Sequence, residues 1–204
     1  MSTATVNSKA TTAIPQRKPY MSSTRLGMWW FLASEVGTFG GVVVSFLMMR
    51  YAHPEWAREA GHTNQMIGII NTIVLLTSSY TMVQAHHAAE HLNTAKAKKL
   101  VLATMGMGLL FLCFKAVEYT LEIREGNYPN GTSAKLFWSF YFGMTGLHCL
   151  HIIAGLLMML FLVLFMHRPY VLKRVAPIGL YWHFVDIVWI LLFPLLYVAS
   201  HTGH

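Results

Sequence analysis

Glu35 is a single carboxylate inside a long apolar run that extends from Met28 to Arg50. A predominantly apolar run of about twenty residues is enough to cross a bilayer as one helix. An ionisable side chain within such a helix is costly to bury, which makes Glu35 a candidate functional residue. At a rise of 1.5 Å per residue, it lies roughly 10 Å from the Met28 end of the run. Two roles stay open, a proton-linked carboxylate and a structural one bonded to a neighbouring helix.

Two other apolar runs contain an acid next to a base at helical spacing. Lys115 and Glu118 are three residues apart and therefore share a helical face, which Glu122 continues. An ion pair between them lowers the cost of both charges in a membrane and favours a structural role. His183 and Asp186, in YWHFVDIVW, have the same spacing. They form either part of a proton path or a polar contact between helices.

Histidines supply the remaining candidates. His148 and His151, in TGLHCLHIIAG, share a face and suit either metal binding or proton transfer. Because no carboxylate is near them in sequence, contacts to packed helices, lipid head groups or a partner subunit are favoured over a metal.

A second histidine group occurs where another apolar run ends, and it contains His86, His87, Glu90 and His91. The spacing of His87 and His91 is one that zinc ligands use, and a lipid-acting membrane metalloenzyme would carry several such boxes. This sequence has only one, so a group that gathers protons is the favoured interpretation. We predict no metal site and no catalytic residue in this chain.

Long apolar helices must position these side chains. Hydrophobic residues make up 55% of the 204 residues and charged residues only 11%, against about 25% charged in soluble domains. The net charge of +7 does not indicate nucleic-acid binding, because the basic residues form short clusters between apolar runs. We predict an all-α integral membrane protein, with a polar tail at residues 1–25 and one domain at 26–204. The five predicted spans cover about 28–49, 66–85, 100–121, 136–166 and 178–200, joined by loops of roughly 11 to 16 residues.

Lysines and arginines predict how the spans are oriented. Ten of them fall in the tail and in the loops after the second and fourth spans, against four on the other side. Basic residues concentrate on the cytoplasmic side, so we expect the N-terminus inside and the C-terminus outside. Four tryptophans lie near span ends, where aromatic belts are expected: Trp29, Trp30, Trp138 and Trp182.

Five stretches in this order resemble subunit III of the haem–copper terminal oxidases, and cytochrome c oxidase subunit III most of all. The resemblance covers about residues 25–200, with one motif in each span. The stretches are RLGMWWFLASEVGTFGG, NTIVLLTSSYTMVQAHHA, FKAVEY, FYFGMTGLHCLHIIAG and YWHFVDIVWILLF.

The resemblance implies a non-catalytic subunit without a redox centre of its own. Such a subunit packs against the catalytic subunit I, together with subunit II, in an enzyme that reduces oxygen to water and pumps protons. The haems and copper lie in the partner subunits. Subunit III supports proton uptake, protects subunit I from inactivation during turnover and binds phospholipid. Glu35 matches the family's carbodiimide-reactive glutamate, and the family's other recurring polar positions, which make helix, lipid and interface contacts, match Glu118, His148, His151, His183 and Asp186.

One departure concerns length, because the usual subunit III has seven spans and this sequence lacks the first two. Five-span forms of subunit III occur in bacteria, so the resemblance implies a location in a bacterial inner membrane. In such complexes the catalytic subunit can supply the two helices that subunit III lacks. Subunit III of a quinol oxidase and the related accessory protein of a nitric oxide reductase stay open as alternatives. An independent transporter is disfavoured, because the sequence shows no inverted repeat.

Overall fold

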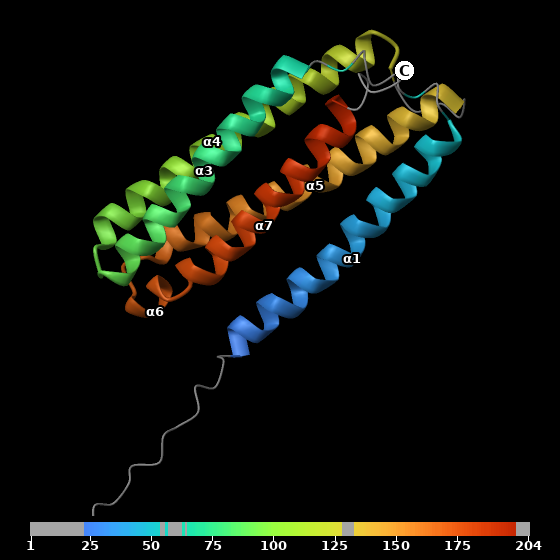
Figure 1. Cartoon of the computed structure of the whole chain (residues 1–204). Helices are drawn as coiled ribbons and strands as arrows, with labels where there is room; N and C mark the ends of the chain where they lie inside the picture. Colours follow the sequence, from blue (N-terminus) through green and yellow to red (C-terminus); the bar gives the residue numbers. More distant parts are fainter. Residues whose placement is uncertain (1–22, 54–55, 57–62, 64, 128–132, 199–204) are drawn as a thin grey trace, which may run out of the picture.

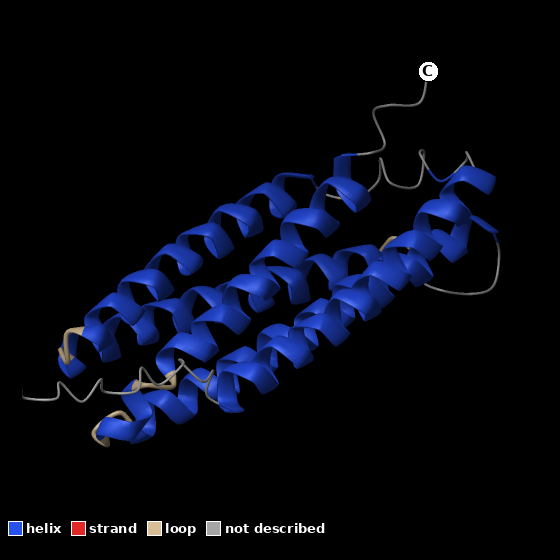
Figure 2. Cartoon of the chain, turned by 60° about the horizontal axis from the view of Figure 1, so that its bottom comes forward, coloured by secondary structure: helices blue, strands red, loops and turns tan. Residues whose placement is uncertain are grey.

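The computed structural model describes residues 23–53, 56, 63, 65–127 and 133–198. Within these residues the chain forms only helices, turns and short connections (Figure 2). The helices are α1 (Ser23–Ala52), α3 (Gln65–Glu90), α4 (Thr94–Arg124), α5 (Ser133–Phe165), α6 (Pro169–Leu172), α7 (Val175–Phe193) and the π-helical turn η1 (Pro194–Val198). Five stretches are long and apolar enough to cross a membrane. The predicted all-α, five-helix architecture is confirmed, and the chain is a multi-pass membrane protein.

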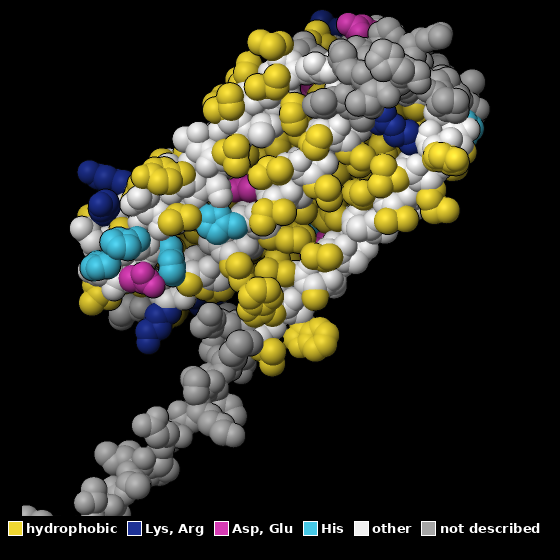
Figure 3. Space-filling model, viewed as in Figure 1, with side chains coloured by type: hydrophobic (Ala, Val, Ile, Leu, Met, Phe, Trp, Pro, Cys, Tyr) yellow, Lys and Arg dark blue, Asp and Glu magenta, His cyan; other side chains and the backbone are white. Residues whose placement is uncertain are grey.

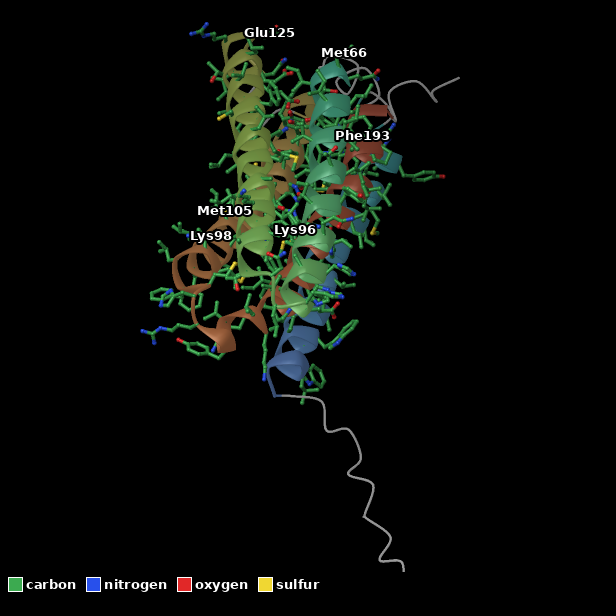
Figure 4. The ribbon with its side chains drawn as sticks, turned by 90° about the vertical axis from the view of Figure 1, so that its left-hand side faces the viewer. Met66, Lys96, Lys98, Met105, Glu125 and Phe193 are labelled. Carbon is green, nitrogen blue, oxygen red and sulfur yellow. The ribbon has the colours of Figure 1, made fainter. Side chains whose placement is uncertain are left out.

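The helices α3 and α4 form an antiparallel pair on one side of the bundle, α1 lies on the other, and α5 and α7 lie between them (Figure 1). Met66 and Glu125 lie at one end of the α3–α4 pair, and Lys96 and Lys98 lie toward the other (Figure 4). Every third or fourth residue of α3 is buried, including Gly68, Asn71, Leu75, Ser78 and Met82. This helical period turns one stripe inward and leaves the remaining apolar residues on the outer surface of the bundle.

The connection between α3 and α4 is much shorter than predicted, because only residues 91–93 separate the two helices. The side chain of Asn93 caps α4 by accepting a hydrogen bond from the backbone N–H of Lys96 at 3.1 Å. Leu92 takes a left-handed conformation, with φ of 55°, which turns the chain sharply. Lys96, Lys98 and Lys99 therefore lie in the first turns of α4 rather than in a loop. Polar residues extend both helices beyond their apolar runs.

The last predicted span, 178–200, falls on a membrane-spanning stretch, Tyr170–Tyr197, that contains more than one helical element. The α-helix begins at Val175 and ends at Phe193, where Pro194 removes a backbone donor and a π-helical turn follows. Two side chains from other elements bond to carbonyls of this turn. Arg50 donates to the carbonyl of Leu195 at 3.3 Å, and Gln65 donates to that of Tyr197 at 2.8 Å. These contacts satisfy acceptors that the end of a helix leaves free. Residues 199 and 200 lie outside the described part.

Two tryptophans predicted to form an aromatic belt lie in the core instead. Trp138 and Trp182 are fully buried. The ring of Trp182 fits between two glycines on neighbouring helices. A Cβ added at Gly108 of α4 or at Gly155 of α5 would lie 2.8 Å from this ring, which is too close for any side chain. Trp182 thus fills the space between α4, α5 and α7.

Candidate functional site

Lys115 and Glu118 form an ion pair deep in the bundle, with Lys115 Nζ 3.0 Å from Glu118 Oε2. Lys115 also donates to the hydroxyl of Tyr197 at 2.8 Å and to that of Tyr141 at 3.2 Å. Both tyrosine hydroxyls donate to Glu118 Oε1 at 2.6 Å. Glu122, one turn further along α4, lies outside this group and accepts a hydrogen bond from the Asn127 amide at 2.8 Å.

Every donor and acceptor in this group of Lys115, Glu118, Tyr141 and Tyr197 has a hydrogen-bond partner. An ammonium has three donors, and Lys115 has three acceptors within reach. The Glu118 carboxylate accepts one bond from the lysine and one from each tyrosine. Because opposite charges are paired and every polar atom has a partner, the group joins α4 to α5 and η1 without an unmatched charge. The arrangement is that of a structural ion pair.

His148 lies in the core without a hydrogen-bond partner among the described residues, at either ring nitrogen. Its ring stacks on Trp189, with centroids 5.2 Å apart, and meets the edge of Phe111 at 5.6 Å. His151, one turn further along α5, turns to α1 instead. The two histidines share a helical face but contact different helices, so the structure does not bring them together as a ligand pair.

Glu35 and His151 meet between α1 and α5, with Glu35 Oε2 3.0 Å from His151 Nε2. The other ring nitrogen, Nδ1, lies 2.8 Å from the carbonyl oxygen of Leu147. The Tyr181 hydroxyl donates to the backbone carbonyl of His151 at 2.9 Å, which adds α7 to the contact. The side chains of Glu35 and His151 are 16% and 14% exposed, so both are largely withdrawn from solvent.

The protons in this contact can be counted. A carbonyl only accepts, so the bond to Leu147 requires a hydrogen on Nδ1 of His151. The contact between Nε2 and Glu35 then holds one shared proton, either as an imidazolium with a carboxylate or as an imidazole with a carboxylic acid. Both forms have zero net charge. Glu35 is thereby joined to a second titratable group.

Asp186 is buried in α7, with only 3% of its surface exposed. Neither carboxylate oxygen makes a hydrogen bond to a described residue. No hydrogen bond joins Asp186 to His183; His183 Nδ1 lies 2.6 Å from the hydroxyl of Ser79 on α3. His183 and Ser79 thus form a polar contact between α7 and α3, and Asp186 lies one turn further along α7.

The histidine group at the end of α3 separates into two pairs. His86 Nε2 lies 3.7 Å from Glu90 Oε1, and the rings of His87 and His91 lie 4.4 Å apart. Histidine side chains gather at this end of the bundle, and another lies closer to its middle (Figure 3). Among the described residues, no three His, Cys, Asp or Glu side chains are arranged to hold a metal ion.

Comparison with known proteins identifies the family. The family model for cytochrome c oxidase subunit III matches residues 4–201. The chain belongs to the cytochrome c oxidase subunit III family. The predicted resemblance is thereby confirmed, and this family is part of the haem–copper oxidase complex.

Relatives in the subunit III family have different names. Cytochrome c oxidase subunit 3 of Thermostichus vulcanus is 33% identical over 180 residues, which are 86% of this chain and 87% of the relative. The heme-copper oxidase subunit I+III of Aeropyrum pernix is 31% identical over 86% of this chain and 22% of the relative. A probable quinol oxidase subunit 3 of Staphylococcus aureus is 28% identical over 93% of this chain and 96% of the relative.

Proposed function

We propose that this chain is the non-catalytic subunit III of a cytochrome c oxidase that reduces oxygen to water and pumps protons. The family match over residues 4–201 carries the proposal. In the complex it packs against subunits I and II, which hold the haems and copper, and it binds phospholipid. The Aeropyrum pernix relative, whose name joins subunits I and III in one chain, supports subunit I as the direct partner.

The basic residues support a location in the bacterial inner membrane. Lys96, Lys98 and Lys99 lie at the start of α4, and Lys173 and Arg174 lie just before α7, all at the same end of the bundle. We call this end the α6 end, because α3 ends there and α6 lies there (Figure 1). Under the positive-inside rule the α6 end faces the cytoplasm, which places the N-terminus inside and the C-terminus outside.

Glu35 is the proton-linked residue of this proposal. Its 3.0 Å hydrogen-bond contact with His151 is the supporting observation, because it joins the carboxyl group to a second group that can carry a proton. The alternative role, a structural contact that attaches α1 to α5, uses the same hydrogen bond. The two roles differ when the acid is replaced by an amide, which keeps a hydrogen bond but cannot exchange the proton.

We therefore expect Glu35→Gln to lower proton-coupled turnover of the assembled oxidase while the subunit stays bound. The amide keeps a hydrogen bond to His151 but has no acid proton to exchange, so the loss falls on proton transfer and not on the binding of the subunit. Oxygen consumption and proton uptake over many turnovers measure the effect. Glu125→Gln, an exposed carboxylate after α4, is the control. Wild-type turnover and wild-type lifetime of the Glu35→Gln oxidase would leave Glu35 with a structural role only.

A quinol oxidase subunit III is the second candidate, favoured by the name of the Staphylococcus aureus relative. The two candidates differ in the electron donor of the complex and not in the fold of this chain. Oxygen consumption by the purified complex with reduced cytochrome c, compared with a reduced quinol, decides between them.

A further inference from the structure

Two exposed histidine rings lie side by side at the α6 end, where α3 ends. The ring centroids of His87 and His91 are 4.4 Å apart, and the ring planes are tilted by 32°. Both side chains are exposed, whereas His86 pairs with Glu90 and lines a separate pocket. Histidines four residues apart on one face of a helix are spaced as zinc ligands can be. The structure brings these two rings close enough to bind one ion together.

One nitrogen of the His91 ring already has a fixed role. Nδ1 of His91 lies 2.9 Å from the carbonyl oxygen of His87. Because a carbonyl only accepts, this bond requires a hydrogen on Nδ1, and in the neutral imidazole the lone pair is then on Nε2. Histidines that bind metals commonly donate their other N–H to a backbone carbonyl, which fixes the tautomer and the ring orientation. His91 thus has the tautomer and the hydrogen bond of a metal ligand.

The backbone that carries His91 is held by the tight turn after α3. The N–H of Leu92 donates to the carbonyl of Ala89 at 3.1 Å, and the N–H of Asn93 donates to that of Ala88 at 2.9 Å. Together with the left-handed conformation of Leu92, these bonds form the Schellman motif that ends many helices. His91 therefore cannot move away from His87 unless this turn opens.

The charges around the pair allow a cation to bind. The C-terminal end of a helix carries a partial negative charge, which favours a cation at the end of α3. The exposed lysines at the start of α4 oppose it, namely Lys96, Lys98 and Lys99. Their ammonium groups are on flexible stems, and salt screens exposed charges over about 8 Å at physiological ionic strength. A dication bound by two imidazoles is therefore not excluded by the field of α4.

The ligand type selects the class of metal. Imidazole nitrogens suit zinc, copper and nickel ions, whereas calcium and magnesium ions take oxygen ligands. In the part of the chain that the structure describes, no third His, Cys, Asp or Glu side chain completes a metal site. Zinc is usually four-coordinate, so water fills the remaining positions and the ion can exchange with solution.

We propose that His87 and His91 form a chelating site for an exchangeable divalent ion of the zinc and copper class. The site goes beyond the proposed function and does not depend on it. A metal was disfavoured from the sequence because one histidine group is too few for a lipid-acting metalloenzyme, but an exchangeable ion needs only one pair. The bound ion joins the last turn of α3 to the residue before the turn.

Zn²⁺ binding to the purified full-length chain in detergent, with a tag that contains no histidine, tests the site. We expect wild type to bind one equivalent of Zn²⁺ that His87→Gln and His91→Gln lose. Changes around a metal ligand cost 10–100-fold in affinity, so removal of a ligand itself should weaken binding by at least about tenfold. The matched control is His86→Gln, one residue away and in the other pair, which should keep wild-type binding. Other histidines contribute equally to all four proteins.

Two results of this titration would overturn the proposal. Equal Zn²⁺ binding by wild type, His87→Gln and His91→Gln would show that the pair binds no ion. Loss of the same equivalent in His86→Gln would show a site with other ligands. Because the readout is binding without turnover, it stays independent of whether the complex reduces oxygen.

Cu²⁺ as a probe counts the ligands directly. The electron paramagnetic resonance spectrum of one equivalent of Cu²⁺ should show two imidazole nitrogens in wild type and in His86→Gln. His87→Gln and His91→Gln should each show one nitrogen at most. A single nitrogen in wild type would contradict a chelate.

The turn after α3 supplies a third measurement. Opening of this turn separates the two ligands, so an ion that binds only the closed turn stabilises it. Zn²⁺ should therefore slow amide hydrogen exchange at Leu92 and Asn93 in wild type and have no effect in His91→Gln. Exchange in wild type that does not respond to Zn²⁺ would contradict a chelate that spans the end of α3.

Discussion

Replacement of Lys115 by Met should lower the free energy of unfolding by about 3–5 kcal/mol, the cost of removing one partner of a buried ion pair. The methionine keeps most of the volume of the side chain but removes the cation. Glu118 then retains only the two tyrosine hydroxyls, at 2.6 Å each, for a carboxylate that is almost completely buried. A detergent-denaturation titration of the chain in mixed micelles, followed by tryptophan fluorescence, measures the change.

The double variant Lys115→Met/Glu118→Gln separates loss of charge pairing from loss of packing. An amide accepts the tyrosine hydrogen bonds without a charge, so the double variant should be more stable than Lys115→Met alone. Lys98→Met, at an exposed position on the same helix, should stay within about 0.5 kcal/mol of the wild type. If Lys115→Met behaved like Lys98→Met, the pair would be worth no more than a surface ion pair.

Replacement of Trp182 by Ala should cost about 3–5 kcal/mol, as expected for a large aromatic side chain removed from a core. The ring is fully buried and fits against the backbone of Gly108 and Gly155. Because the two glycines have no side chain, they cannot fill the space that the ring leaves. The indole also donates from Nε1 to the hydroxyl of Ser78 at 3.0 Å. The same denaturation titration measures the loss.

Trp182→Phe keeps an aromatic ring in the space and should cost less than Trp182→Ala. The Ser78 hydroxyl still donates to the carbonyl of Leu75 at 2.7 Å, so the lost indole bond leaves no unsatisfied donor on the serine. Trp30, which is 72% exposed, supplies the control Trp30→Ala. Similar losses for Trp182→Ala and Trp30→Ala would show that Trp182 does not hold the helices together.

The helices could be predicted from the sequence because spanning length and low charge are local properties. Each of the five apolar runs lies within one of the membrane-spanning stretches, apart from the last residues of the fourth and fifth. Boundaries were less predictable where polar residues continue a helix, as Lys96 and Lys98 do in α4. The break at Pro194 does have a signal in the sequence, since proline cannot donate to the helical ladder.

Partners across helices could not be predicted. The ion pair between Lys115 and Glu118 could be predicted, because the two residues are three positions apart on one helix. Tyr141 and Tyr197, which complete the hydrogen bonds of this pair, lie on other elements. Glu35 was identified by its type and depth, whereas His151, 116 residues away, became its partner only through the packing of α1 on α5. Spacing along one helix says nothing about which helix will face it.

The most direct measurement is a spectrum of whatever co-purifies with this chain. The tagged chain is isolated from native membranes in mild detergent, and its reduced-minus-oxidised optical spectrum and oxygen consumption are recorded. Membership of the subunit III family and the proposed role predict haem bands from the partner subunits, with oxygen consumed by the same preparation. A colourless chain without partners and without oxygen consumption would contradict the proposed function.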